Sequence, residues 1–89
     1  MILQKRVVVK NKLGLHARPA ALFVQTASKF RSDVFLEKDA HEVNGKSIMG
    51  VMMLAAEMGS TLLLTVKGDD EEKALGELIE LFETKFNEE

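Results

Sequence analysis

Helix-type and strand-type patterns alternate along a chain of only 89 residues, and this alternation strongly constrains the fold. Runs with strand propensity occupy residues 2–9, 34–36, 41–43 and 61–66. Apolar residues at helical spacing predict helices over 16–29 and 48–55, and a third whose apolar face runs from 74 to 86. The predicted order is βαββαβα. Because a chain of this length supports one hydrophobic core, we expect a single domain over residues 1–89.

The connections between these segments predict a layered arrangement. Strands joined through helices imply crossover connections, which are right-handed in nearly all proteins and by themselves favour parallel neighbours. Each helix pattern has one apolar face, so all three helices should cover the same face of a four-stranded sheet. We expect turns over residues 37–40 and at Asn44-Gly45, and we expect Gly59 to close the second helix.

Composition and charge narrow the function classes. The chain is 46% hydrophobic and 29% charged, which is typical of a soluble globular protein. Its net charge of −2 argues against nucleic-acid binding, and it has no cysteine for a disulfide framework. Its first residues lack the apolar run of a signal peptide, and no segment approaches the roughly 20 apolar residues of a membrane span. We therefore expect a cytoplasmic protein without membrane insertion.

One histidine stands where the first helix is predicted to begin. Polar residues 11–14 precede His16, and Pro19 suits the first helical turn. The unpaired amides of that turn and the helix dipole favour an anion, and the dipole keeps the imidazole neutral and nucleophilic. Arg18 adds a planar donor that matches phosphate oxygens. The sequence predicts that His16 accepts a phosphoryl group, with Arg18 and the amides of Ala17 and Arg18 holding its oxygens.

Other interpretations of His16 stay open from the residues alone. A lone histidine near a helix start is often only a surface residue. Zinc needs three or four ligands, yet the only other histidine is His41 and cysteine is absent, so we expect no metal and no cofactor. Nothing marks the nucleophile of a Ser-His-Asp triad.

The second predicted helix combines a capping serine with an excess of methionine. Ser47 is the expected N-cap, and Met49, Met52, Met53 and Met58 follow within ten residues. Two or three helical turns cannot point all these side chains inward, so some should form an exposed apolar surface for partners, although core packing is the alternative for any one of them. Ser47 is either a simple cap or a phosphorylation site whose charge would switch partners at that surface.

Two sequence motifs resemble one family. Gly14-Leu15-His16-Ala17-Arg18-Pro19-Ala20 resembles the active-site motif of HPr, the phosphocarrier family of the bacterial phosphoenolpyruvate-dependent sugar phosphotransferase system. Lys46-Ser47-Ile48-Met49-Gly50 is similar to the regulatory serine region of HPr from low-GC Gram-positive bacteria. The resemblance covers essentially all 89 residues. It implies an α+β open-faced β-sandwich, with a four-stranded antiparallel sheet and three helices on one face.

The resemblance also implies roles and partners. His16 would receive a phosphoryl group on Nδ1 from phospho-enzyme I and pass it to the IIA domain of a sugar permease, with Arg18 as the active-site arginine. Ser47 would be modified by HPr kinase/phosphorylase, and the modified form would bind catabolite control protein A. We expect a monomeric carrier that is not a turnover enzyme. The expected docking residues are Leu15, Ala21, Ile48, Met49 and Met52.

Two other functional classes remain as alternatives. A regulatory binding module would act mainly through phosphorylated Ser47, like the paralogue Crh, which lacks the active histidine, or would belong to a nitrogen-type phosphotransferase system. A small anion- or metal-binding domain is the third class. Because His16 is present, the resemblance favours HPr over Crh.

Overall fold

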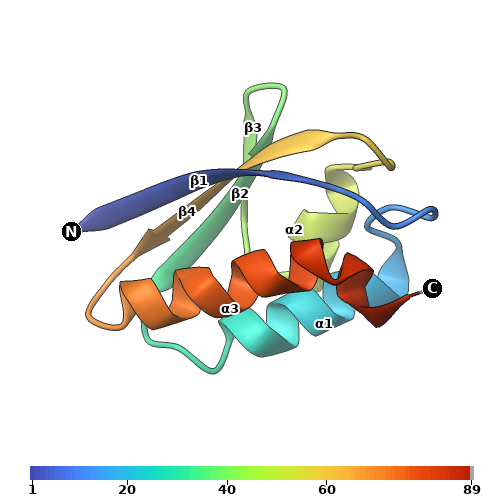
Figure 1. The fold of residues 1–89 in the computed structure, drawn as a ribbon. Helices are drawn as coiled ribbons and strands as arrows, with labels where there is room; N and C mark the ends of the chain where they lie inside the picture. The colour runs from blue at the N-terminus through green and yellow to red at the C-terminus, as the bar shows by residue number, and fades with distance from the viewer. Residues whose placement is uncertain (89) are drawn as a thin grey trace.

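A four-stranded sheet and three helices make up the computed structural model, which describes residues 1–88 (Figure 1). The observed order confirms the predicted βαββαβα arrangement, and most element boundaries agree within two residues. The strands are β1 (Ile2–Val8), β2 (Asp33–Lys38), β3 (His41–Asn44) and β4 (Thr61–Lys67), and the helices are α1 (Ala17–Ala27), α2 (Ile48–Met53) and α3 (Glu71–Glu83), with a short 3-10 turn η1 (Lys85–Asn87) after α3.

The strands are ordered β1-β4-β2-β3, and every neighbouring pair is antiparallel. The parallel pairing suggested by crossovers alone is therefore wrong, and the antiparallel sheet implied by the resemblance is confirmed. The reason is intercalation. Strand β4 lies between β1 and β2, and β2 lies between β4 and β3, so strands joined by a crossover helix run parallel but are never adjacent.

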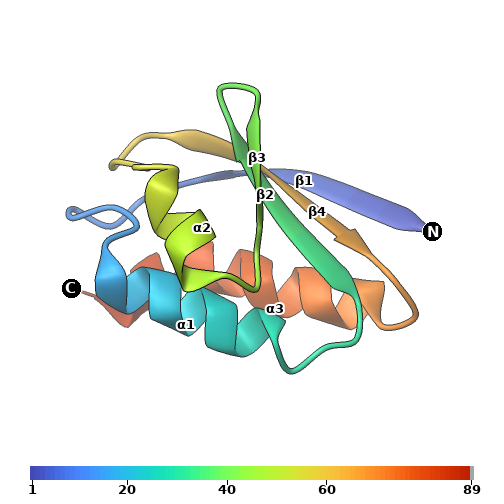
Figure 2. The same cartoon turned by 180° about the vertical axis from the view of Figure 1, so that it is seen from behind.

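All three helices lie on one face of the sheet, and the core fills the space between the layers (Figures 1 and 2). The Phe23 ring of α1 meets the Phe82 ring of α3 edge-on, with centroids 6.0 Å apart. Alternate strand residues point into the core between the sheet and the helices. Residues such as Gln4 and Thr65 lie on the open face of the sheet, where their side chains are hydrogen-bonded at 3.1 Å. The fully buried strand residues include Leu36, Leu62, Leu64 and Val66.

Two turns differ from the expectation. Strand β2 continues to Lys38, and the turn is confined to Asp39 and Ala40, whose positive φ angles of 51° and 68° suit a tight hairpin. Helix α2 ends at Met53, so the expectation that Gly59 closes it is wrong. The chain leaves the helix at Ala55, directly after the C-cap Leu54, because its positive φ of 50° cannot continue an α-helix.

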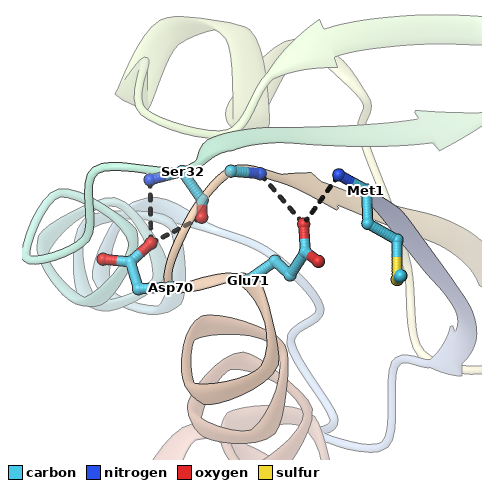
Figure 3. A network of polar contacts seen from close by, with 5 residues as sticks. Met1, Ser32, Asp70 and Glu71 are labelled. Carbon is cyan, nitrogen blue, oxygen red and sulfur yellow. Dashed lines mark hydrogen bonds and ion pairs between the residues drawn. The ribbon is translucent and has the colours of Figure 1, made fainter.

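Polar contacts fasten two loops at the end of the molecule opposite the 10–16 loop (Figures 1 and 3). The Asp70 carboxylate accepts hydrogen bonds from the Ser32 hydroxyl (2.5 Å), the Ser32 N–H (3.0 Å) and the Arg31 N–H (2.9 Å). Glu71 Oε1 accepts the Gly68 N–H and lies 3.7 Å from the N-terminal amine of Met1. The Asp70 hydrogen bonds hold the α1–β2 and β4–α3 loops against each other, and Glu71 links the β4–α3 loop to Met1.

Candidate functional site

His16 is the N-cap of α1, as the sequence predicts. Its backbone is extended, with φ −75° and ψ −170°, and its carbonyl accepts the Ala20 N–H at 3.0 Å. The ring does not cap the helix, so it is available for other contacts. Pro19 has no N–H, which leaves the amides of Ala17 and Arg18 as the donors of the first turn.

The loop before His16 is held tightly to the segment after α2. The Leu15 N–H donates to the Ala56 carbonyl at 2.9 Å, and Gly14 adopts a positive φ of 69°. A Cβ at Gly14 would lie 2.4 Å from the Ala56 oxygen, so only glycine fits there. Leu15 itself is only 4% exposed and belongs to the core. Its expected place in an exposed docking surface is therefore revised: it anchors the loop that carries His16.

The His16 ring contacts a carboxylate from the other end of the chain. Its Nε2 lies 2.8 Å from Glu88 Oε2, while Glu88 Oε1 accepts a 3.0 Å hydrogen bond from Asn11 Nδ2. Asn11 is fully buried, and its Nδ2 also donates to the Gly14 carbonyl at 2.7 Å. An ionised carboxylate only accepts hydrogen bonds, so a hydrogen bond between these two atoms requires the ring hydrogen to be on Nε2.

Sequence reasoning missed both Asn11 and Glu88. In the sequence, Asn11 is one of the polar residues before His16, and Glu88 is one of the polar residues 87–89. Glu88 is 72 residues from His16 and 77 from Asn11, so no local pattern connects the three. The proximity arises because α3 and η1 return the end of the chain to the beginning of α1 (Figure 1).

Charged side chains of both signs line the surface near the ring. Arg18 is exposed and lines one shallow hollow with Lys12 and Glu88. His16 lines a second hollow with Lys12, Glu57 and Met52. The His16 side chain is 36% exposed, so an incoming macromolecule can reach it. The arrangement places the ring and the first turn of α1 beside two cations, Lys12 and Arg18, and two carboxylates, Glu57 and Glu88.

The second predicted feature lies at α2. Ser47 is its N-cap, and the Ser47 Oγ accepts the Gly50 N–H at 3.0 Å, which confirms the predicted cap. Of the expected docking residues, Ile48 (43% exposed), Met49 (70%) and Met52 (40%) are at the surface, and Ala21 of α1 is half-buried. The prediction of exposed methionines is thus confirmed. Met52 shares a hollow with His16, so the two features adjoin.

Among residues 1–88, no three His, Asp or Glu side chains come together in a way that could hold a metal ion. None of the helices described for these residues has the length and apolarity needed to cross a bilayer.

The antiparallel sheet with three helices on one face is an open-faced β-sandwich, and a half-buried histidine is the N-cap of its first helix. A family model described as the PTS HPr component phosphorylation site matches residues 3–84. The chain belongs to the HPr family of phosphocarrier proteins.

Relatives and solved structures agree over nearly the full chain. The phosphocarrier protein HPr of Xylella fastidiosa is 52% identical over 87 residues, which cover 98% of each chain. The crystal structure of an HPr from Thermoanaerobacter tengcongensis is similar with a TM-score of 0.94 and 55% identity, covering 98% of each chain. The Bacillus subtilis protein Crh, crystallised as a dimer with a swapped domain, has a TM-score of 0.76 and 52% identity over 93% of this chain and 95% of its own.

Proposed function

We propose that this chain is a single-domain phosphocarrier of residues 1–89 that takes a phosphoryl group onto His16 Nδ1 from phospho-enzyme I and passes it to the IIA domain of a sugar permease. The main observation in its support is the position of His16 as the half-buried N-cap of α1, with its Nε2 2.8 Å from Glu88 Oε2. It works in the cytoplasm as a carrier that is regenerated at each transfer, not as a turnover enzyme.

Phosphoryl transfer needs positioning and charge stabilisation more than covalent chemistry from the protein. Nδ1 attacks phosphorus, while the Ala17 and Arg18 amides and the Arg18 guanidinium hold the phosphoryl oxygens. The open surface around His16 suits this role because donor and acceptor must reach the same atom in turn.

The decisive experiment is phosphorylation by enzyme I and phosphoenolpyruvate, followed by mass spectrometry. We expect one phosphate on His16 that is labile in acid and stable in alkali. His16→Ala should abolish it, and Arg18→Ala should slow transfer at least tenfold. The matched control is His41→Ala, which removes the exposed histidine of β3 and should change nothing. A His16→Ala protein that still accepts the phosphate would refute the proposal.

We propose a docking surface for these partners over Ala21, Ile48, Met49 and Met52. These residues adjoin His16 through the hollow that Met52 shares with it. Transient docking requires only a modest apolar surface. Met49→Glu should raise the KM for phospho-enzyme I about tenfold with little change in the unfolding free energy, since Met49 is 70% exposed. Met58→Glu, at 57% exposure outside this set, serves as the control.

A second, regulatory function rests on Ser47. Its hydroxyl stands beside the exposed apolar side chains of Ile48 and Met49, so a phosphate there would add about two negative charges to the docking surface. We propose that HPr kinase/phosphorylase modifies Ser47 and that the product binds catabolite control protein A. An acid-stable phosphate formed with kinase and ATP should disappear in Ser47→Ala and persist in Ser28→Ala. If regulator binding is the same in Ser47→Ala, this second function is excluded.

The proposed carrier acts as a monomer. Docking of enzyme I and IIA domains in turn on one surface requires that surface to be free. Light scattering across a concentration series should give the mass of one chain, whereas a constant dimer mass would support a Crh-like swapped assembly.

A further inference from the structure

The contact between His16 and Glu88 is maintained by a small set of well-packed residues. Asn11 is fully buried and directs one amide hydrogen to Glu88 Oε1, so it fixes the carboxylate from the side away from the ring. Glu88 itself is only 14% exposed in its side chain. Its two carboxylate oxygens each have a partner, at 2.8 and 3.0 Å, so the side chain is held from both sides.

The turn η1 supplies the path that brings Glu88 to the ring. Lys85, Phe86 and Asn87 all have positive φ angles, between 54° and 59°, which is unfavourable for residues other than glycine. Burial of the Phe86 ring, 3% exposed and edge-on to Phe82 at a centroid distance of 4.9 Å, compensates for that cost. The chain therefore reverses after α3 in a defined conformation, and Glu88 returns to α1.

We propose that Glu88 is a positioning residue for phosphoryl transfer, and that Asn11 and Glu88 form a C-terminal clamp that keeps the hydrogen of the His16 ring on Nε2. This inference rests on the proposed carrier function, which requires Nδ1 as the nucleophile. The carboxylate can only accept a hydrogen bond, so the ring form with hydrogen on Nδ1 and a lone pair on Nε2 would place two acceptors 2.8 Å apart.

The clamp acts on both halves of the transfer. In the first half, the Nδ1 lone pair forms the N–P bond while the bond from phosphorus to the donor's leaving atom breaks, and that atom keeps the electron pair. Nε2 retains its hydrogen, so the ring gains positive charge that faces Glu88. In the second half, a nucleophilic atom of the acceptor forms a new bond to phosphorus while the N–P bond breaks. The electron pair of that bond returns to Nδ1, which leaves a neutral ring with hydrogen on Nε2. The other charged groups around the ring are Lys12, Arg18 and Glu57.

The test combines a ring measurement with a rate measurement. In nitrogen-15-labelled, unphosphorylated protein with a neutral ring, NMR should show His16 as one species with hydrogen on Nε2. Glu88→Ala should give a mixture of both ring forms and about a tenfold slower phosphoryl transfer from phospho-enzyme I, in line with the loss of one hydrogen bond. Glu88→Gln keeps an oxygen acceptor and should restore the Nε2–H form.

The matched control is Glu83→Ala, which removes a neighbouring carboxylate that pairs with Lys10 at 2.7 Å and does not touch His16. It should leave both ring form and rate unchanged. Ring signals identical to wild type in Glu88→Ala overturn the clamp, whatever the rate does. If wild type takes no phosphate on His16, the carrier function fails, but the ring signals still decide whether the clamp exists.

Discussion

Asp70 is a single side chain that joins two loops distant in the sequence (Figure 3). Hydrogen bonds from the Ser32 hydroxyl and then from the Arg31 N–H stabilise its charged form and lower its pKa from 3.8 to about 2. Gly68 allows this approach, because a Cβ there would lie 2.6 Å from the Ser32 hydroxyl oxygen. One carboxylate thereby orders the end of the molecule opposite His16.

The lowered pKa of Asp70 predicts a specific pH dependence. Because its pKa is depressed in the folded state, the stability that it contributes is complete above about pH 4 and is lost as the pH falls through about 2. Asp70→Asn should therefore unfold at a lower temperature than wild type at pH 7, and the difference should shrink between pH 4 and 2. Circular dichroism melts at a series of pH values measure this. A difference that is constant down to pH 2 would contradict it.

Two glycines make a matched pair at the residue scale. Gly14 has a positive φ and no room for a Cβ, whereas Gly76 lies in the exposed interior of α3 with nothing within 4 Å of a Cβ. Gly14→Ala should lower the unfolding free energy by about 2–4 kcal/mol through strain and overlap. Gly76→Ala should raise it by about 0.5–1 kcal/mol. Urea unfolding of both variants tests the pair, and equal effects would show that the loop at Gly14 adapts.

At the scale of elements, α2 has few internal means of stability. It has six residues and one fully buried side chain, Val51, and it contains Gly50. Its N-cap and the contacts of its C-terminal end must therefore hold it. Lys38 supplies contacts at the C-terminal end, since its Nζ donates to the carbonyls of Leu54 and Ala55 at 3.2 and 3.1 Å.

The N-cap of α2 should be worth about 1 kcal/mol. Ser47→Ala loses the acceptor of the Gly50 N–H and should lower the unfolding free energy by that amount, while Ser47→Asp keeps an acceptor and should lose less. Chemical denaturation provides the measurement, with Ser28→Ala as the control, because Ser28 is exposed and its hydroxyl caps nothing in the described chain. An unchanged Ser47→Ala protein would mean that tertiary contacts alone hold α2.

At the scale of the whole molecule, one aromatic cluster links the core to the candidate site. The Phe82 ring is 1% exposed and lies between the rings of Phe23 and Phe86. It therefore connects α1, α3 and η1. Packing at the centre of the helical layer and the return of Glu88 to His16 depend on the same side chain.

Phe82→Ala should lower the unfolding free energy by about 3–5 kcal/mol, which is a large share of the about 5–15 kcal/mol of a typical domain. Thermal unfolding measures the loss. The control is Phe35→Ala on the open face of the sheet, where a half-buried ring should matter less. If both variants unfolded at the same temperature, the cluster would not have the central role that its burial indicates.

Much of this protein follows from local sequence patterns. The alternation of apolar residues determines which segments become strands and helices, because each segment must bury one face. Pro19 and the loop before it place His16 at a helix N-terminus, and Ser47 caps α2 because its hydroxyl reaches an N–H three residues on. The exposed methionines of α2 follow from the number of apolar side chains in so short a helix.

Only the tertiary structure decided the rest. The order of the strands depends on which strand inserts between the two that a crossover joins. The sequence does not reveal this, because strand propensity is the same for parallel and antiparallel neighbours. Leu15 looks like a surface residue of the motif until the segment around Ala56 packs over it. The contact of Glu88 with His16 and Asn11 joins opposite ends of the chain, so it exists only once α3 has packed beside α1 and the buried Phe86 has turned the chain back.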